Sequence, residues 1–429
     1  MPLISVREFG KLHIGELDPA RPSITANQAV LLRSLKRVHG FDIFKFVNET
    51  TLSAQQYVGA TQAGGLTVEV LPKIEGIADT TIRRNLVAML SVALDLEISE
   101  GDVAKVATQT HGILEVLIRL FCDKLFAQVH RGLVRRYEGR EENLPLLRGK
   151  LGVKEQVRLN AANPERLYCR FDEFQEDNPL NQILKAAVRL LLKASRELTN
   201  QRQLAELMLI FEGVSDVPRH ALPWHRISFD RLNDRYRPAY KLAQLFLTNT
   251  PPDVSGGGVQ GFSLFFEMNS LFEEYVGRIA RRVFRPEGYQ VALQGPIRYL
   301  AFDESSKRDV FAMKPDVVGL KDRMPQWIMD TKWKELSLEE AKEGVSQSDL
   351  YQMYAYANCY ACNDVVLVYP HHAGMGPTAG IRASYQLKSW TGGGAARIRV
   401  ATLDLSDLKS VPGQLSSILQ FESSAATVA

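Results

Sequence analysis

The spacing of apolar residues changes along the chain from a strand period to a helical one. Near the N-terminus, ISVREF, KLHIGEL and GGLTVEVLPKI alternate between apolar and polar residues, which is typical of half-buried strands, and a helix over residues 25–39 interrupts them. From about residue 79, leucines and valines recur every three or four residues, which predicts amphipathic helices. The pattern therefore predicts a β-rich domain over residues 1–78 and a helical domain over residues 79–249.

A concentration of Pro, Gly and Ser in TPPDVSGGGVQGF, residues 250–262, marks the clearest boundary in the chain. A helix, strands, another helix and a strand are expected after it, so we place a C-terminal domain over residues 250–429. The small and polar residues from Phe421 onward are expected to fray. Together these elements predict an α/β protein of the α+β kind.

The composition is that of a globular protein. The 429 residues are 45% hydrophobic and 24% charged, which allows two or three cores and excludes a disordered or membranous chain. A formal charge of +3 says little about partners. Arg7, Glu8 and Lys11 stand where a signal peptide needs an apolar core, and no run of about 18 apolar residues follows. We therefore expect a protein that is neither exported nor inserted into a membrane.

The four cysteines favour a reducing, cytoplasmic location over a disulfide framework. Cys359 and Cys362 form a lone CxxC pair, whereas zinc normally takes four ligands and no second CxxC or HxxxH motif occurs in the sequence. A zinc or redox role for this pair is therefore the least favoured hypothesis.

Charged residues gather in two segments of the middle region. The basic group consists of Arg131, Arg135, Arg136, Arg140, Arg148, Lys150, Lys154 and Arg158. It is either a DNA-facing strip or a solvated helix face running into a basic loop. The acidic group consists of Asp172, Glu173, Glu176 and Asp177. It precedes a helix that Asp177 or Asn178 can cap and that Pro179 begins, so capping explains it better than a metal site.

The chemistry concentrates in KPDVVG and WIMDTK. Asp316 opens an apolar strand, and Asp330 ends a second short buried strand at a spacing typical of a hairpin. Residues two apart in a strand point to the same side, so Asp330 and Lys332 project together. Two carboxylates can hold Mg²⁺, which activates water and neutralises phosphate charge. Lys332 can orient that water or stabilise developing negative charge, so the group suits phosphodiester hydrolysis.

Two helices are expected to complete this group. Upstream, FEMNSLFEEYVGRIARRVF has an apolar face, with Glu273 at its edge and Glu274 opposite it. Downstream, QSDLYQMYAYANCY places Gln352 and Tyr356 one turn apart on a common face. Glu273 can therefore approach the aspartates, and Gln352 and Tyr356 either position DNA phosphate or form a partly buried polar face.

The order helix-Glu, strand-PD, strand-DxK, helix-QxxxY resembles the PD-(D/E)XK nucleases with a QxxxY motif. KPDVVG, DTKWK, SDLYQMYAYA, LFEEYV and CRFDEFQEDNPLNQIL further resemble the McrC family over nearly the whole chain. The resemblance implies a C-terminal nuclease domain with a central mixed sheet flanked by helices. It also implies Mg²⁺ on Asp316 and Asp330, supported by Glu273 directly or through water.

The same resemblance implies further roles. Lys332 would act on the water, the Thr331 carbonyl would complete the metal site, and Gln352 and Tyr356 would lie behind the site or contact DNA. Lys334, two residues further along, is expected outside the site.

The family resemblance also implies partners. The chain would cleave double-stranded DNA together with a hexameric McrB-like AAA+ GTPase, which reads 5-methylcytosine and whose GTP hydrolysis it stimulates. The N-terminal domain would bind this partner, with exposed loops in residues 48–65 as a plausible surface. No GxxxxGK[ST] loop occurs, so this chain itself is expected to bind no nucleotide. The alternatives are a stand-alone repair or CRISPR-type nuclease and a non-catalytic activator of an AAA+ motor.

Overall fold

The chain folds into two compact units, which are described separately. The computed structural model describes residues 2–16, 18, 21–74, 76–98, 101–103, 112–163, 165–249, 262–339, 341–387 and 396–419. Unit 1 combines Met1–Ile113 with Phe265–Ala429, and unit 2 is Leu114–Leu264. None of the helices within the described ranges is long and apolar enough to cross a membrane.

The N-terminal part of unit 1 contains two small sheets and two helices. One sheet has the strand order β1-β7-β6-β11 and the other β3-β2-β5-β4. The strands are β1 (Leu3–Arg7), β2 (Lys11–Ile14), β3 (Ser23–Ile24), β4 (Phe44–Asn48), β5 (Thr51–Ala54), β6 (Tyr57–Ala63), β7 (Leu66–Leu71) and β11 (Ser263–Glu267). Helices α1 (Ala26–His39) and α2 (Asp79–Ala93) accompany them. The strands and the helix predicted before residue 78 are thus present.

Local chemistry explains where α1 begins and ends. Thr25 accepts a hydrogen bond from the backbone of Gln28, whose side chain accepts from the backbone of Thr25, which completes a capping box. Gly40 ends the helix in the left-handed conformation, where glycine carries no steric penalty. Beyond α1, the buried Glu69 of β7 binds Arg83 of α2 at 2.7 Å and fixes that helix to the sheet.

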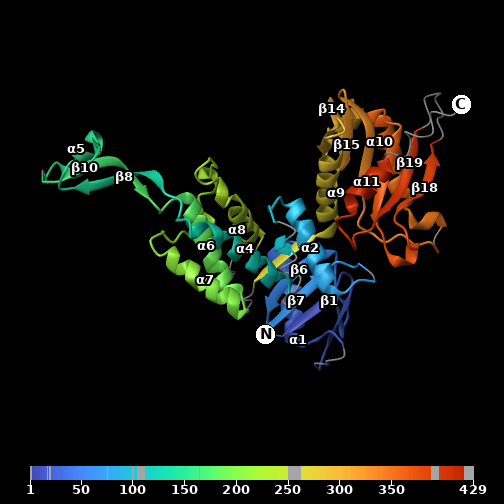
Figure 1. Cartoon of the computed structure of the whole chain (residues 1–429), viewed down its shortest axis with the longest axis horizontal. Helices are drawn as coiled ribbons and strands as arrows, with labels where there is room; N and C mark the ends of the chain where they lie inside the picture. Colours follow the sequence, from blue (N-terminus) through green and yellow to red (C-terminus); the bar gives the residue numbers. More distant parts are fainter. Residues whose placement is uncertain are drawn as a thin grey trace. The chain divides into compact units, whose positions relative to one another are not determined.

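The C-terminal part of unit 1 is a mixed sheet between helices, as predicted (Figure 1). Its strand order is β12-β15-β16-β17-β19-β18, with β16, β17 and β19 parallel and the other neighbours antiparallel. The strands are β12 (Gln290–Leu293), β15 (Val317–Lys321), β16 (Met324–Thr331), β17 (Asp364–Pro370), β18 (Gly380–Gln386) and β19 (Arg397–Leu403). A separate hairpin is formed by β13 (Arg298–Asp303) and β14 (Arg308–Met313).

Helices cover both faces of this sheet. On one face, α10 (Gln347–Tyr360) packs Met353, Tyr356 and Tyr360 over the side chains of β15, β16, β17 and β19. On the other face lie α9 (Met268–Phe284), whose Phe284 contacts the Trp327 ring, and α11 (Val411–Leu419). Alternate residues of each strand therefore enter different apolar layers, which accounts for the almost complete burial of β16 and β17.

Unit 2 consists of helices and a three-stranded sheet. The helices are α4 (Ile113–Val129), α5 (Val153–Asn160), α6 (Pro179–Ala194), α7 (Leu198–Ile210) and α8 (Arg237–Asn249). The sheet has the order β8-β10-β9, with β8 (Arg136–Leu144), β9 (Lys150–Leu151) and β10 (Leu167–Gln175). As predicted, Asn178 caps α6 by accepting from the backbone of Asn181, and Pro179 occupies its first turn.

Two local predictions were wrong. The basic segment after α4 is not a helix face running into a loop, because it forms β8, β9 and α5 and pairs with β10. Most of residues 48–65 are not exposed loops, because β5 and β6 lie there and are almost entirely buried, whereas the turns at residues 48–50 and 64–65 are exposed. The predicted boundary loop and the fraying tail fall on residues 250–261 and 420–429, outside the described residues.

The division of the chain into three consecutive domains stays a prediction. The contacts in the structure join the first part of the chain to the last in unit 1, and α2 packs against α9. Asn85 of α2 donates to the Leu405 carbonyl at 2.8 Å and to the Ser406 carbonyl at 3.1 Å. Helix α2 thus has direct contacts with the C-terminal part of unit 1.

Candidate active site

The hairpin of β15 and β16 brings Asp316 and Asp330 together. The strands pair antiparallel from Val317 opposite Met329 to Lys321 opposite Met324, as the spacing of the two aspartates predicts. Gly319 is required because an added Cβ would lie 2.1 Å from the Trp327 ring. Asp316 comes directly before β15 and lies beside the end of β16. Strands β16 and β17 are parallel, and both end at this edge of the sheet.

Asp316 is held by the residue that follows Asp330. Its Oδ2 accepts hydrogen bonds from the Thr331 backbone N–H at 2.7 Å and from the Thr331 hydroxyl at 2.9 Å. Its carbonyl accepts from the backbone of Gln294 at 2.8 Å. Burial raises the pKa of Asp316, although the hydrogen bonds from Thr331 and the charge of Lys332 oppose the rise.

Asp330 and Lys332 form an ion pair, which confirms that they project to the same side. Asp330 is 1% exposed, and its Oδ2 lies 2.5 Å from Lys332 Nζ. Among the described residues no group makes a hydrogen bond of good geometry to this oxygen. Burial and then the neighbouring Asp316 charge raise the pKa of Asp330. Burial lowers the pKa of Lys332, but Asp330, Asp316 and Asp349 outweigh it, so its pKa is raised and the amine carries a charge.

Glu273, on α9, is connected to the region of Asp316 through the side-chain amide of Gln294. Gln294 donates to Glu273 Oε1 at 2.8 Å and accepts from Lys314 Nζ at 2.8 Å. Burial and the charge of Asp316 raise the pKa of Glu273. Within the described ranges no three His, Cys, Asp or Glu side chains are arranged to hold a metal ion together. Direct binding by Glu273 therefore lacks support in this conformation, and its action through water stays a prediction.

Gln352 and Tyr356 share a face of α10, as predicted. Gln352 Nε2 donates to the Tyr356 hydroxyl at 2.9 Å, and that hydroxyl donates to the Lys314 carbonyl at 3.1 Å. Tyr356 is 3% exposed. Its hydroxyl therefore fixes the backbone two residues before Asp316, which supports a place behind the site better than contact with DNA.

The sequence did not single out the group around Asp349. Lys334 pairs with Asp349, whose Oδ2 also accepts from the Tyr369 hydroxyl at 3.0 Å. The charge of Asp349 contributes to the raised pKa of both Asp330 and Lys332. Lys334 has a partner of its own, in agreement with its expected place outside the aspartate pair. The one sequence signal was an aspartate three residues before Gln352, which also reads as an ordinary first-turn acid.

The two cysteines of the CxxC pair are free thiols. Cys362 is buried, which raises its pKa to about 11, and its thiol donates to the Asp364 carbonyl at 3.4 Å. A thiol held in this protonated form is a poor metal ligand and a poor nucleophile. Together with the lack of a three-ligand group in the described part of the chain, this disfavours a zinc or redox site.

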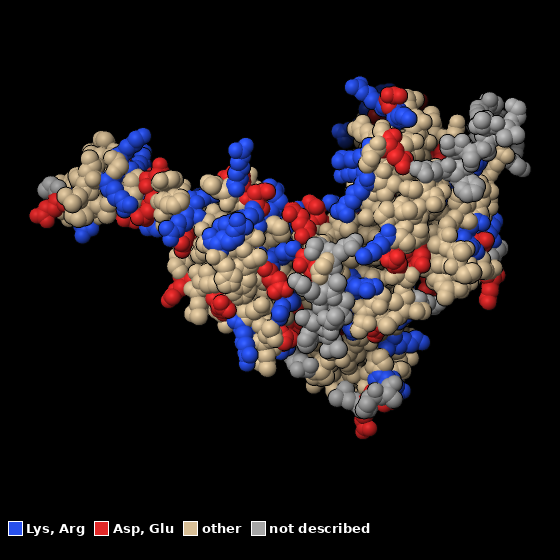
Figure 2. All heavy atoms as spheres, in the orientation of Figure 1, with Lys and Arg blue, Asp and Glu red and all other residues tan. Residues whose placement is uncertain are grey.

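Four of the eight basic residues of this segment, Arg135, Arg136, Arg140 and Arg148, form ion pairs in the described structure. Arg135 binds Glu176, Arg140 binds Glu142 and Glu173, and Arg148 binds Glu173, all between 2.7 and 3.2 Å. Figure 2 accordingly shows acidic side chains interleaved with basic ones over the β8–β10 ribbon. The paired arginines therefore have a structural role, and contact of the segment with DNA stays a prediction.

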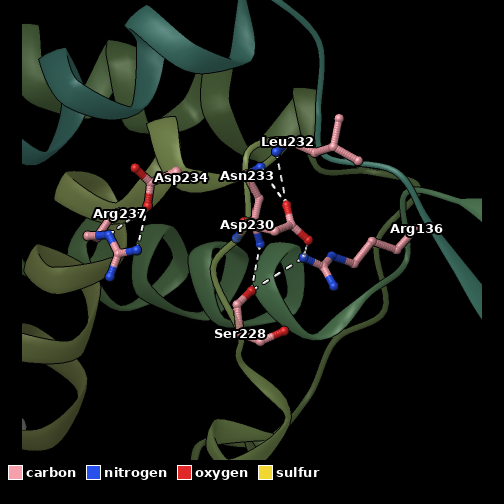
Figure 3. Close-up of polar contacts among 7 residues, drawn as sticks. All are labelled: Arg136, Ser228, Asp230, Leu232, Asn233, Asp234 and Arg237. Carbon is pink, nitrogen blue, oxygen red and sulfur yellow. Dashed lines mark hydrogen bonds and ion pairs between the residues drawn. The ribbon is translucent and has the colours of Figure 1, made fainter.

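Arg136, the first residue of β8, fixes the base of the β8–β10 ribbon (Figure 3). Arg136 Nη2 lies 2.6 Å from Asp230 Oδ2 and 3.3 Å from the Ser228 carbonyl. Asp230 in turn accepts from the backbone of Leu232 at 2.9 Å and of Asn233 at 3.3 Å. The acidic and basic residues around β8 thus hold the loop before α8.

Comparison with solved structures relates this fold to chains of McrB–McrC complexes. The chain resembles a chain of the refined half-complex from the tetradecameric assembly of Thermococcus gammatolerans McrB AAA+ hexamers with bound McrC, with 21% identity and a TM-score of 0.69. That match covers 97% of this chain and 100% of the other. A match to the Thermococcus gammatolerans McrBC complex has 25% identity and a TM-score of 0.52, and covers 66% of this chain and 88% of the other.

Sequence comparison gives the family. No curated protein matches the chain. The model of the family described as McrBC 5-methylcytosine restriction system component matches residues 52–370, which is well over half of the sequence. The chain therefore belongs to the McrBC 5-methylcytosine restriction system component family, and the resemblance to its McrC members is confirmed.

Proposed function

We propose that this chain is the Mg²⁺-dependent endonuclease subunit of a GTP-dependent restriction system directed at 5-methylcytosine. It cleaves double-stranded DNA in complex with an AAA+ GTPase partner and stimulates the GTP hydrolysis of that partner. The observation that carries the proposal is the convergence of Asp316, Asp330 and Lys332 at the end of β16, with Asp330 buried, Asp316 half-buried and the pKa values of both carboxyl groups raised.

The donor set suits Mg²⁺. Buried carboxylates that repel one another favour a bound cation, and Mg²⁺ needs only one or two protein carboxylates because it keeps several waters. Asp330 offers a buried oxygen without a well-formed hydrogen bond in the described structure. When bound, the metal would lower the pKa of an attacking water and neutralise charge on the phosphate. Asp316 and Asp330 would hold it, and Glu273 would act through water.

The protein's own groups have distinct tasks in this proposal. Lys332 is charged, so it donates a hydrogen bond to the water or to the developing negative charge and does not serve as the base. Thr331 fixes the orientation of Asp316 by donating two hydrogen bonds to it. Gln352 and Tyr356 hold the backbone of Lys314, and so keep Asp316 beside the end of β16.

The partner assignment rests on the family and on the related complexes. One related structure contains McrB AAA+ hexamers with bound McrC, and we extend that association to this chain. The sequence lacks a phosphate-binding GxxxxGK[ST] loop, so a separate GTPase would supply nucleotide hydrolysis. The four free cysteines support a cytoplasmic site of action.

Cleavage of methylated and unmethylated plasmid tests the proposal. Wild type and Asp330→Ala are compared with Mg²⁺ and GTP, each with and without the AAA+ protein encoded beside this chain. We expect cleavage that needs the partner, GTP and methylation, and a loss of at least about 100-fold in Asp330→Ala while GTP hydrolysis persists. Equal cleavage by Asp330→Ala would refute the site. Brisk cleavage without nucleotide would indicate a stand-alone nuclease, and stimulation without any cleavage would indicate an activator.

A further inference from the structure

A glutamate from the N-terminus contacts the segment that follows the candidate catalytic lysine. The indole N–H of Trp333, the residue after Lys332, donates to Glu8 Oε2 at 3.0 Å. The same oxygen accepts from the backbone N–H of Lys73 at 3.1 Å. Glu8 lies directly after β1, so this oxygen connects the turn after β1 and the end of β7 with the end of β16.

The environment of Glu8 is unusual for a carboxylate. Glu8 is only 2% exposed, and its Oε1 has no hydrogen-bond partner among the described residues. A buried carboxylate with one unsatisfied oxygen is unfavourable for the fold by itself. The two hydrogen bonds to the other oxygen, Oε2, offset part of this cost. One of them is the contact with Trp333, which we regard as the reason for a glutamate at this position.

Trp333 is fixed from a second direction, which leaves Lys332 between constrained neighbours. The Trp333 ring meets Phe272 of α9 edge-on, with 5.4 Å between centroids. On the other side, the backbone N–H of Lys332 donates to the Val368 carbonyl of β17 at 2.9 Å. The direction in which the Lys332 side chain leaves the strand thus depends on β17 before it and on Trp333 after it.

We propose that Glu8 is a positioning residue for Lys332, and that it acts by fixing Trp333 through the indole hydrogen bond. The inference rests on the proposed function and deepens it, because it gives the N-terminal region a direct mechanical connection to the cleavage site. A partner that moves the turn after β1 changes the position of Lys332. Binding at the N-terminal region and cleavage at the C-terminal region are coupled through this contact.

Two substitutions separate the hydrogen bond from general packing. Glu8→Ala removes the acceptor, whereas Glu8→Gln retains an oxygen that can accept from both N–H groups. Trp333→Phe removes the donor and keeps a ring against Phe272. Glu304→Ala is the matched control, because it makes the same substitution at an exposed residue in the turn between β13 and β14. All variants are made in the full chain and assayed for cleavage with the partner, GTP and Mg²⁺.

Loss of the hydrogen bond is expected to lower kcat, and a variant that keeps the bond is expected to retain kcat. Glu8→Ala and Trp333→Phe lower kcat by on the order of 10- to 100-fold, since small displacements of a catalytic group have effects of this size. KM for DNA and the stimulated GTP hydrolysis stay within about twofold, because the partner and substrate surfaces are unchanged. Glu8→Gln and Glu304→Ala stay near wild type. The double variant Glu8→Ala/Trp333→Phe is no worse than either single variant, because both remove the same bond.

Other outcomes overturn the inference. Wild-type kcat in Glu8→Ala, or equal losses in Glu8→Gln and Glu8→Ala, would show that the hydrogen bond does not position Lys332. Additive losses in the double variant would show that Glu8 and Trp333 act separately. A wild-type chain that never cleaves would refute the proposed function itself, and the coupling with it. That failure is distinguishable because it appears before any substitution is made.

Discussion

Burial raises the cost of ionising both Asp316 and Asp330, and the charge of Asp316 adds to that cost at Asp330. A site arranged for a divalent cation has this property when no cation neutralises it, because it sacrifices stability for function. Lys332 offsets only part of the repulsion, since one ammonium faces two carboxylates. The electrostatics at this scale therefore favour metal binding over a purely structural ion pair.

Removal of the Asp330 charge is expected to lower activity and to raise stability. Asp330→Asn abolishes cleavage and, without Mg²⁺, raises the free energy of unfolding by about 1–2 kcal/mol, because a buried charge next to Asp316 is removed. Mg²⁺ stabilises wild type and not the variant. Thermal unfolding with and without Mg²⁺ measures both effects. Glu274→Gln on the same unit is the control, and a variant less stable than wild type would contradict the prediction.

The buried carboxyl of Glu8 predicts a pH dependence of stability. Burial raises the pKa of Glu8 from its usual 4.5 to about 7, so the folded protein binds a proton that the unfolded chain releases between these values. Its contribution is fully present below pH 4.5 and is lost as the pH rises through 7. Relative to Glu8→Gln, wild type should lose about 3 kcal/mol of unfolding free energy over that interval. Urea unfolding of both proteins at pH 5 and pH 8 tests this, and parallel curves would contradict it.

At the scale of elements, the β15–β16 hairpin is the part that sequence predicts best. Its spacing, its apolar runs and the DxK alternation are local properties, so they predict the pairing of Asp316 with Asp330 and the direction of Lys332. Neighbouring helices α9 and α10 follow from their 3.6-residue period for the same reason.

Contacts between distant segments could not be predicted in this way. Glu8 meets Trp333 and Lys334 meets Asp349 only after the sheet and α10 are assembled, and a single charged residue carries no periodic signal. The β8–β10 ribbon was missed because arginines and glutamates that pair across strands also suit an exposed helix. In β5 and β6, short strands with few large apolar residues resemble loops until the second sheet covers them.

The hairpin also predicts a sharp intolerance at Gly319. An added Cβ would overlap the Trp327 ring, so Gly319→Ala should lower the free energy of unfolding by about 1–3 kcal/mol through overpacking. It should reduce cleavage as well, because Trp327 lies on the strand that carries Asp330. Gly413→Ala in α11 is the control, since its Cβ would meet no atom within 4 Å and alanine favours helices. Denaturant unfolding distinguishes them, and equal stabilities would refute the packing argument.

At the scale of the molecule, unit 1 is made from both ends of the chain. Its N-terminal part contacts its C-terminal part through polar bonds and packing: Asn85 with Leu405, Lys73 with Glu335 at 2.6 Å, and α2 with α9. Unit 2 lies between these ends in sequence and is an insertion into unit 1. If the N-terminal region binds the partner as proposed, such connectivity lets it influence the proposed cleavage site without a long relay of residues.

This arrangement predicts that the C-terminal third does not reach its full stability alone. A fragment of residues 262–429 leaves the α2-facing side of α9 and the edge around Trp333 uncovered, and each large side chain exposed there costs about 1.5–3 kcal/mol. Amide exchange in β16 should therefore be at least about tenfold faster in the fragment than in the full chain. Addition of residues 1–113 should restore protection, whereas addition of residues 114–264 should not. Equal protection in the fragment and the full chain would instead support an independent domain beginning near residue 250.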